Sequence, residues 1–457
     1  MSGPAHNILG SLPVPKLVWT MSAPIMLSML MSAIYNLVDS IYVAQVSELD
    51  FLALSYAYPV QLMMVAFCAG TGVGFNALFA QRLGAGQKEE ANRVACHGFL
   101  FYGLCWLLFL AFALLGAPLF FRLSTDNAAV GTSYLVICCG LSIGMCMQFL
   151  TERLLQTTGH PAGFMIVQGS GAILNIILDP VFIFGLDMGV VGAAAATVIG
   201  QISGACIGFF LLWRIRGEFS VSFRGFRPDR ALSAELLRIA APAVVMQSLS
   251  SFMSLGLNQL LTLWSDTAVF VLGVYFKIQS FVFMPIFGVN SGLIPILSYN
   301  YGAKSAPRLS QAVRFGVQLA LSAAAAGAVL LALAAGPLLR YCFHAGGAAA
   351  AMGVPALRMA ALSFPIAAVS IILSAAFQSL GHSGSSLLIA LLRQILLLLP
   401  IAALFLWLVP DGIWLSFLIA ETITCVATLL LYRRTVRPLI AALAVPGPSS
   451  DSASSSH

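Results

Sequence analysis

Long runs of apolar residues, each about as long as a bilayer is thick, limit the folds open to this chain. Hydrophobic residues make up 60% of the 457 residues, charged residues only 8%, and the mean hydropathy is +0.96. A water-soluble domain of this composition lacks the polar residues to cover its surface. A membrane-spanning helix needs about 20 apolar residues, whereas a barrel strand needs about 10 with alternation. The runs therefore predict an all-α integral membrane protein.

Twelve such runs predict transmembrane helices, six in each half of the chain. The first six are Leu17–Val46, Leu52–Phe79, Val94–Leu115, Val130–Leu150, Phe164–Phe184 and Val190–Trp213. The second six are Leu236–Leu263, Ala268–Leu297, Ala312–Ala335, Val354–Gln378, Leu387–Val409 and Ile413–Tyr432. Four parts are thus expected: an N-lobe (1–213), a basic cytoplasmic connecting loop (214–234), a C-lobe (235–437) and a disordered tail rich in Pro and Ser (438–457).

The net charge is +6, and the 22 Lys and Arg residues are unevenly spread. Most lie at the two termini and in the even-numbered loops, where we also place Arg153, whereas the opposite side holds few basic residues and several acids. The positive-inside rule then predicts that both termini are cytoplasmic. The basic connecting loop is interpreted as a solvated loop facing the membrane surface, and nucleic acid is not an expected partner.

An internal repeat relates the two halves. Ala23-Pro24 recurs as Ala241-Pro242 (241 − 23 = 218), and Leu83-Gly84-Ala85 recurs as Tyr301-Gly302-Ala303 (302 − 84 = 218). Further along, Gln156-Thr157-Thr158-Gly159-His160 matches Gln378-Ser379-Leu380-Gly381-His382 at an offset of 222 (378 − 156). Because each half has an even number of spans, the halves enter the membrane in the same orientation, as parallel repeats do. Such a pair encloses a central cleft that is typical of a transporter.

Several of these segments together resemble the multidrug and toxic compound extrusion (MATE) family. They are the two Ala-Pro pairs, the Gly-Ala loops, and the motifs Leu174-Asn175-Ile176-Ile177-Leu178-Asp179-Pro180, Gly189-Val190-Val191-Gly192-Ala193-Ala194 and Gln378-Ser379-Leu380-Gly381. The resemblance covers essentially the whole chain, with both halves in order. The segment Phe276-Lys277-Ile278-Gln279-Ser280-Phe281 further resembles the bacterial MepA-like branch.

The resemblance implies a twelve-helix, V-shaped, two-lobed antiporter of the inner (cell) membrane. Such proteins expel cationic or amphipathic organic compounds in exchange for H⁺ or Na⁺. The family's N-lobe cluster for the coupling ion maps here onto Asp39, Asn175, Asp179 and Thr197. We therefore expect a multidrug efflux protein that works as a monomer in the lipid bilayer on small organic cations or drugs. We expect no cofactor and no enzymatic activity, and of the two ions we favour H⁺.

The residues support this cluster independently. A carboxylate at bilayer depth costs at least about 2.5 kcal/mol, so Asp39 and Asp179 must face a cavity or a partner. Asn175 and Asp179 share one face of a helix, and Tyr35, Asn36 and Asp39 share another. Structural alternatives stay open: Asp39 snorkels at a helix end, Asp179 caps a kink at the following proline, or Asn175 and Thr197 only join helices.

The second half of the chain has fewer ionisable candidates. Lys277, with Gln279 nearby, is a candidate intramembrane cation that takes part in exchange; the alternative is a structural ion pair between Lys277 and Glu421. Arg393 and Glu421 are further candidates for the cavity. The seventh helix offers only amides, and the tenth offers no acid after Met359, which disfavours a carboxylate ion site in the C-lobe.

Other functional patterns are weak. Gly70-Thr71-Gly72-Val73-Gly74 lies in an apolar run without a following Lys, so close helix packing is favoured over a phosphate loop. The nine cysteines and six histidines show no metal-site spacing, and His160 and His382 are interpreted as parts of equivalent turns. A second functional class stays open: a flippase for a lipid-linked or anionic precursor.

Overall fold

The computed structural model describes residues 8–44, 48–124, 128–216, 221–343 and 346–444, and within these ranges it contains helices and no β-strand. The helices of the first half are α1 (Ile8–Ser11), α2 (Val14–Ala44), α3 (Glu48–Gly84), α4 (Lys88–Ala111), α5 (Ala117–Ser124), α6 (Ala128–Gly140), α7 (Ile143–Thr157), α8 (Pro161–Pro180) and α9 (Gly189–Arg214). Those of the second half are α10 (Arg230–Thr262), α11 (Asp266–Gly302), α12 (Ala306–Pro337), α13 (Gly347–Ala361), α14 (Phe364–Ser379), α15 (Ser383–Leu391), α16 (Leu398–Leu408), α17 (Leu415–Arg434) and α18 (Val436–Ala444). The prediction of an all-α protein is confirmed.

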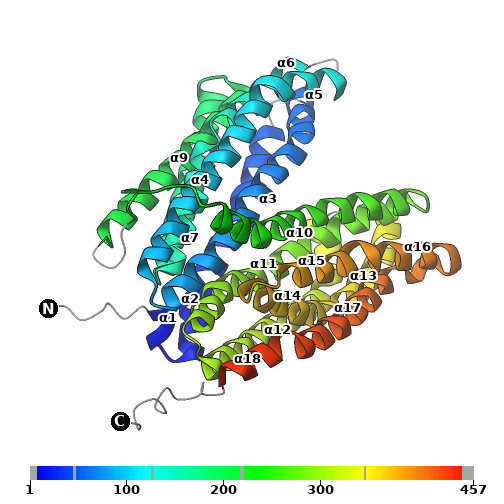
Figure 1. Ribbon diagram of the computed structural model, residues 1–457. Helices are drawn as coiled ribbons and strands as arrows, with labels where there is room; N and C mark the ends of the chain where they lie inside the picture. Colours follow the sequence, from blue (N-terminus) through cyan, green and yellow to red (C-terminus); the bar gives the residue numbers. More distant parts are fainter. Residues whose placement is uncertain (1–7, 45–47, 125–127, 217–220, 344–345, 445–457) are drawn as a thin grey trace, which may run out of the picture.

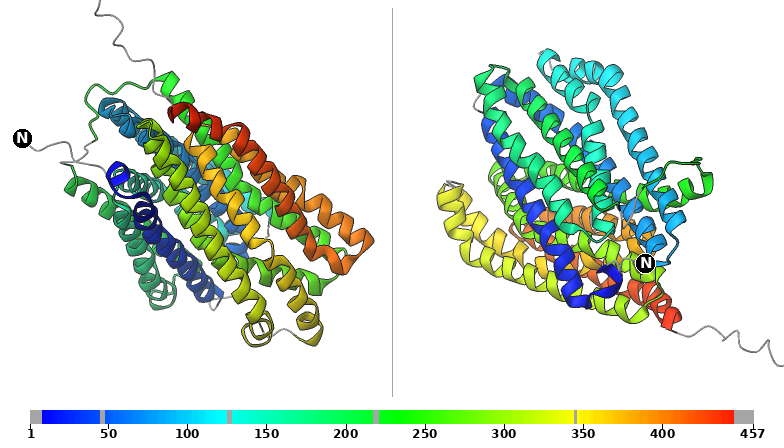
Figure 2. Two further views of the ribbon diagram at one scale, coloured as in Figure 1. Left: turned by 90° about the horizontal axis from the view of Figure 1, so that it is seen from below. Right: turned by 90° about the vertical axis from the view of Figure 1, so that its left-hand side faces the viewer.

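The helices form two lobes that diverge from one end of the molecule, giving it the shape of a V (Figures 1 and 2). The N-lobe contains α2 to α9 and the C-lobe contains α10 to α18. The first and last described residues lie near the closed end of the V, which we call the terminus-bearing end (Figure 1). There the lobes meet through α3 against α10 and α11, and through α2 against α11.

The number of membrane spans agrees with the prediction. In the described residues, ten helices are long and apolar enough to cross a bilayer, and two pairs of helices qualify as bent spans. The pairs are Gly131–Gly140 with Ile143–Thr157, bent by 41°, and Gly347–Ala361 with Phe364–Ser379, bent by 43°. Counting each pair as one span gives the predicted twelve. The two breaks fall in the fourth and tenth spans, which are equivalent in the repeat.

Two boundaries predicted from sequence are wrong. The fourth span does not end at Leu150, because α7 continues to Thr157; Arg153, assigned to a cytoplasmic loop, is therefore helical and only 8% exposed. The tail is not disordered from residue 438, because α18 extends to Ala444. Val436 and Ile440 are 0% and 6% exposed and pack on the C-lobe core, which holds this turn in place. Residues 445–457 lie outside the described residues.

Close glycine contacts explain why the repeat keeps one register at the lobe interface. A Cβ added to Gly84 would lie 1.9 Å from the carbonyl oxygen of Tyr299, and one added to Gly302 would lie 2.0 Å from that of Gln81. The two contacts are equivalent in the repeat, with the lobes exchanged, since 302 − 84 and 299 − 81 both equal 218. The lobes are thus related by a pseudo-twofold axis, and the repeated glycines let their backbones touch.

The glycine-rich segment of α3 takes part in the same interface. Cβ atoms on Gly70 and Gly74 would lie 2.5 Å and 2.9 Å from the backbone nitrogens of Val244 and Ala240 on α10. This confirms the packing interpretation of that segment. The repeated turns are also equivalent: Gly159 and Gly381 have φ of 91° and 81°, and each precedes a histidine at the N-cap position of the next helix.

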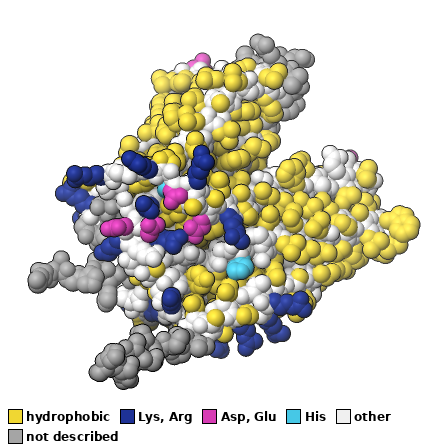
Figure 3. Space-filling model, in the orientation of Figure 1, with side chains coloured by type: hydrophobic (Ala, Val, Ile, Leu, Met, Phe, Trp, Pro, Cys, Tyr) yellow, Lys and Arg dark blue, Asp and Glu magenta, His cyan; other side chains and the backbone are white. Residues whose placement is uncertain are grey.

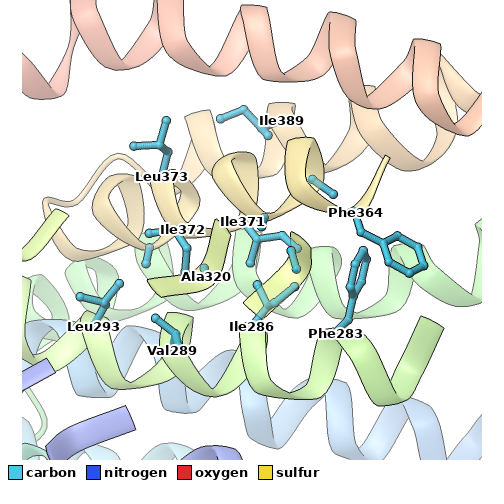
Figure 4. Close-up of a cluster of buried hydrophobic side chains, with 14 of the residues drawn as sticks. Phe283, Ile286, Val289, Leu293, Ala320, Phe364, Ile371, Ile372, Leu373 and Ile389 are labelled. Carbon is cyan, nitrogen blue, oxygen red and sulfur yellow. The ribbon is translucent and has the colours of Figure 1, made fainter. Parts of the chain in front are cut away.

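The part of the C-lobe core shown in Figure 4 lies between α11, α12, α14 and α15. Phe283, Ile286, Val289 and Leu293 recur along one face of α11 and are buried against Phe364 and the apolar residues of α14. The Phe283 and Phe364 rings pack edge to face with centroids 5.2 Å apart, an arrangement that adds about 0.5–1.5 kcal/mol beyond burial. This packing fixes α11, which together with α10 forms the C-lobe side of the lobe interface.

The surface divides into an apolar part and a charged end. On the face in Figure 3, hydrophobic side chains cover both arms of the V, while Lys, Arg, Asp and Glu gather at the terminus-bearing end. Large apolar side chains such as Leu115, Leu333 and Trp407 are 78%, 73% and 81% exposed, which water would penalise and lipid does not. The described part of the molecule is therefore shaped for a bilayer.

Candidate functional site

Three of the four residues predicted to form the coupling-ion cluster meet inside the N-lobe. The Asn175 amide nitrogen donates to Asp179 Oδ1 at 3.2 Å and to Thr197 Oγ1 at 3.3 Å. Asp179 is 0% exposed and Asn175 is 3% exposed. Asn175 and Asp179 lie one turn apart on α8, as their spacing predicted, and Thr197 reaches them from α9.

Two glycines bring α8 and α9 close enough for this contact. A Cβ on Gly171 would lie 2.9 Å from the carbonyl oxygen of Gly200, and one on Gly200 would lie 2.7 Å from that of Gly171. Helices that touch through backbone atoms place short polar side chains within hydrogen-bond reach of one another. After Asp179, Pro180 ends the regular helix and a π-helical turn, Val181–Gly185, follows. The cluster therefore lies next to irregular backbone.

The fourth member of the predicted cluster, Asp39, lies on α2, but its side chain lies outside the described residues, as does that of Asn36. Tyr35, one turn before Asp39, is described and half-buried. The helix α2 packs on α8, where Gln168 Nε2 donates to Ser32 Oγ at 2.8 Å. The backbone of α2 thus runs beside the helix that carries Asn175 and Asp179.

A polar cavity of about 200 Å³ lies beside the cluster. Its walls come from five helices of the N-lobe and include Ser32, Tyr35, Val65, Met145, Gln148, Phe149, Gln168, Gly171, Ala172, Asn175, Thr197 and Gln201. A water molecule occupies about 30 Å³ in the liquid, so the cavity holds several waters or a small hydrated cation. Drug-sized ligands need about 300–1,000 Å³. The cavity is therefore smaller than a drug-sized ligand needs.

The C-lobe contains a buried ion pair between the eleventh and twelfth spans of the chain. Arg393 Nε lies 2.7 Å from Glu421 Oε1, and the two side chains are 16% and 12% exposed. The guanidinium also lies 5.8 Å from the centre of the Phe283 ring. Arg393 lies in a π-helical turn, Leu392–Leu396, an irregularity often found at functional sites.

The alternative of a structural pair between Lys277 and Glu421 is wrong, because Arg393 is the residue that neutralises Glu421. Lys277 is exposed on α11. Gln279, two residues further along, donates from Nε2 to the hydroxyl of buried Tyr275 at 2.9 Å. The C-lobe candidates therefore do not form one cluster: Arg393 and Glu421 make a neutral pair, and Gln279 belongs to the packing around Tyr275.

Removing one member of the buried pair should be costly. We expect Glu421→Gln to lower the free energy of unfolding by about 3–5 kcal/mol, because Arg393 is left without a counter-charge. Thermal unfolding of the purified protein in detergent measures the loss. Glu235→Gln is the matched control, since its partner Arg82 lies on the surface at 3.0 Å and such pairs contribute about 0–1 kcal/mol. Equal losses in the two variants would contradict this role of the buried pair.

Sequence reasoning missed two charged residues, Glu152 and Arg153, which are 2% and 8% exposed on α7. The apolar run ends near Leu150, so Arg153 was assigned to a loop and Glu152 was not considered. A signal was present: Gln148, Glu152 and Gln156 recur at four-residue intervals, as on one face of a helix that continues past the run.

Comparison with known proteins agrees with the fold and the repeat. The sequence model of the MatE family matches residues 24–181 and 242–404, most of both halves, with starts 218 residues apart (242 − 24). The chain therefore belongs to the MATE family of multidrug efflux transporters. Members of this family are transporters and not enzymes, and the protein is a multi-pass membrane protein.

Relatives of known function are bacterial exporters. The multidrug export protein MepA of Staphylococcus aureus (strain MRSA252) is 24% identical over 431 residues, which cover 92% of this chain and 93% of the relative. MepA of Staphylococcus saprophyticus is 24% identical over 422 residues, with 90% and 91% covered. The suspected resemblance to the MepA-like branch is confirmed by these matches.

Solved MATE structures share the fold. The crystal structure of MATE in the straight conformation superposes with a TM-score of 0.90 at 24% identity, covering 96% of this chain and 99% of that one. The crystal structure of MATE in the bent conformation gives a TM-score of 0.88 at 24% identity, covering 95% and 98%. The predicted two-lobed, V-shaped MATE fold is thus confirmed.

Proposed function

We propose that this protein is a secondary active antiporter that exports cationic or amphipathic organic compounds in exchange for H⁺, by rocking of its two lobes. The observation that carries the proposal is the burial of Asp179 beside a polar cavity. A fully buried carboxylate in a membrane helix is expensive, and such residues mark ion and proton pathways. Asp39, one turn beyond the cavity-lining Tyr35 on α2, is proposed as its partner in proton binding.

The donor set favours H⁺ over Na⁺. Asn175 presents its NH₂ group to Asp179 and to Thr197, and a donor cannot ligate a cation, so the amide offers the site only its one carbonyl oxygen, Oδ1. Hard cations prefer a shell of oxygen ligands, whereas a proton needs only a carboxylate that can exchange with water. A carboxylate with an amide donor beside a watery cavity fits proton exchange.

The organic substrate is proposed to bind between the lobes. The N-lobe cavity, at about 200 Å³, is too small for a drug. The hollow between the two arms in Figure 3 is walled mainly by hydrophobic side chains, which suit amphipathic compounds. A two-lobed protein that meets at one end opens this hollow to one side of the membrane at a time when its lobes rock.

Both termini are proposed to be cytoplasmic. The terminus-bearing end carries the basic side chains seen in Figure 3. Basic residues are retained on the cytoplasmic side. With this orientation the V opens to the outside, so the described conformation is outward-facing. The basic connecting loop then faces the anionic lipid surface, with no nucleic-acid partner, and the protein works as a monomer in the inner (cell) membrane.

Efflux of a fluorescent cation tests the proposal. We expect cells expressing this chain to expel ethidium when a pH gradient, acidic outside, is imposed, because inward proton flow through the Asp179 site drives export. An imposed Na⁺ gradient alone should not drive it. Fluorescence decay after loading measures the rate, and cells carrying the empty vector give the background. Efflux that follows only the Na⁺ gradient would overturn the choice of ion.

A flippase for a lipid-linked or anionic precursor remains the alternative function, but the described residues favour it less. An anionic headgroup needs unpaired cations in the cleft, and Arg393 is already neutralised by Glu421. Lys277 is exposed, and we propose it as an intramembrane cation that competes with cationic substrate during exchange. Absence of ethidium efflux under both gradients would shift the weight to the flippase.

A further inference from the structure

Four polar side chains follow the inner face of α7 and are unused by the proposed function. They are Gln148, Glu152, Arg153 and Gln156, which we call the α7 ladder. Glu152, Arg153 and Gln156 are 2%, 8% and 0% exposed, deep for charged and amide groups in a membrane helix. Polar and charged side chains are buried in this way where they form hydrogen bonds with one another or have a function. The ladder has one end at the N-lobe cavity and the other at the C-lobe.

At its first end the ladder touches the cavity. Gln148 lines the cavity that also contains Asn175 and Thr197. Its Nε2 donates to Glu152 Oε1 at 2.9 Å, while its Oε1 lies on the side of Gly204, where an added Cβ would come within 3.2 Å of it. The Gln148 amide therefore donates to Glu152 through its nitrogen, while its oxygen lies toward α9 in the cavity wall.

At its other end the ladder contacts the C-lobe. Gln156 Oε1 accepts from Arg153 Nη1 and from Asn76 Nδ2, both at 3.0 Å. Gln156 Nε2 donates to the carbonyl oxygen of Ser291, on α11 of the C-lobe, at 2.8 Å. This hydrogen bond joins the lobes near the terminus-bearing end, where their backbones touch. The side-chain amide of Gln156 is thus held by Arg153 through its oxygen and contacts the C-lobe through its nitrogen.

One N–H donor of the Arg153 guanidinium makes no hydrogen bond in the described structure. Within the described structure its Nε is buried and makes no hydrogen bond, while Nη1 holds Gln156. Glu152, the adjacent acid, interacts electrostatically with Arg153 and accepts a hydrogen bond from Gln148. If Gln148 turns toward a cation or proton-bound water in the cavity, Glu152 loses its donor. Its carboxylate then attracts Arg153 away from Gln156.

We propose that the α7 ladder couples what occupies the N-lobe cavity to the separation of the lobes at the terminus-bearing end, with Glu152 as the positioning residue. This inference rests on the proposed function, because it assigns how ion binding drives the rocking of the lobes. Ion binding in the cavity weakens the hydrogen bond from Gln148 to Glu152, Arg153 shifts, and the contact from Gln156 to Ser291 opens.

The test uses the full-length purified protein with one spin label on each lobe at this end, at Arg93→Cys on α4 and Arg314→Cys on α12, in a background free of other cysteines. Addition of ethidium, with a drop in pH, should change the distance between the labels in the wild-type background. We expect Glu152→Gln to remove this change and to slow efflux about tenfold, within the usual range of coupling between sites, while ethidium affinity stays within about threefold.

A matched control and two further variants keep the test decisive. Glu235→Gln makes the same chemical change in the exposed contact between the lobes, to Arg82, and should leave the distance response intact. Gln148→Leu and Gln156→Glu break the ladder on either side of Glu152 and should also remove the distance response. If Glu152→Gln fails to fold, these two variants test the ladder in its place. A normal response in Glu152→Gln or in both of these variants would refute the ladder alone. A wild-type protein whose labels do not respond would refute the ladder together with ion-driven rocking.

Discussion

Asp179→Asn is expected to reduce gradient-driven ethidium efflux to the background of cells lacking the protein, with normal membrane abundance. Asparagine has the shape of aspartate, and its Oδ1 still accepts from Asn175 Nδ2, so the contact seen at 3.2 Å survives. It cannot take up and release a proton, and a buried site without a titratable group cannot couple to a proton gradient. Efflux rate together with the amount of inserted protein separates loss of transport from loss of fold.

The control for this experiment lies eight residues further along the chain. Asp187 is exposed and has a φ of 52°, a conformation that asparagine adopts readily. Asp187→Asn therefore makes the same chemical change without strain, and we expect wild-type efflux. Wild-type efflux from Asp179→Asn itself would remove Asp179 from the mechanism. Asp39→Asn is expected to act as Asp179→Asn does.

The second large effect is expected from Gly84→Ala. A Cβ at this position would lie 1.9 Å from the carbonyl oxygen of Tyr299, a backbone atom that cannot rotate away. The lobes must move apart at the terminus-bearing end, at a cost of about 1–3 kcal/mol or more for overpacking. We expect a lower unfolding temperature in detergent and slower efflux, because the closed contact is one of the two states of the rocking cycle. Gly302→Ala, its repeat equivalent, should behave in the same way.

Gly103→Ala is the matched control. Gly103 lies inside α4, and an added Cβ meets nothing within 4 Å. Alanine stabilises a helix by about 0.5–1 kcal/mol relative to glycine, so this variant should be as stable as the wild type or slightly more stable. Equal unfolding temperatures for Gly84→Ala and Gly103→Ala would show that the lobes do not need the close contact.

The C-lobe shows how far local patterns extend. Lys277, Arg393 and Glu421 were all recognised as unusual charges in apolar segments, but their pairing could not be read from the chain. Arg393 and Glu421 are 28 residues apart, on different helices, and meet because α15, α16 and α17 pack together with a π-helical turn at Arg393. Sequence spacing defines faces within a helix, whereas pairing depends on how helices cross.

In the N-lobe, too, some features of the site followed from sequence spacing and others did not. The face shared by Asn175 and Asp179 followed from their spacing, since a helix repeats every 3.6 residues. The approach of Thr197 did not follow, because it depends on the backbone contact between Gly171 and Gly200. Arg153 was misplaced, and Glu152 was not considered, because hydropathy ends a span where apolar residues end. The helix α7 continues past that point, with its polar residues bonded to one another.

The twelve spans, the common orientation of the two halves and the face of α8 that carries Asp179 followed from the sequence alone, because composition, periodicity and repeat register are local or one-dimensional. The family followed from the resemblance of short motifs in order along the chain. Only the tertiary structure decided that Gly84 and Gly302 hold the lobes together, that Arg393 neutralises Glu421, and that the α7 ladder joins the cavity to Ser291. Each of these contacts lies between helices far apart in the chain, and their distances are set by packing.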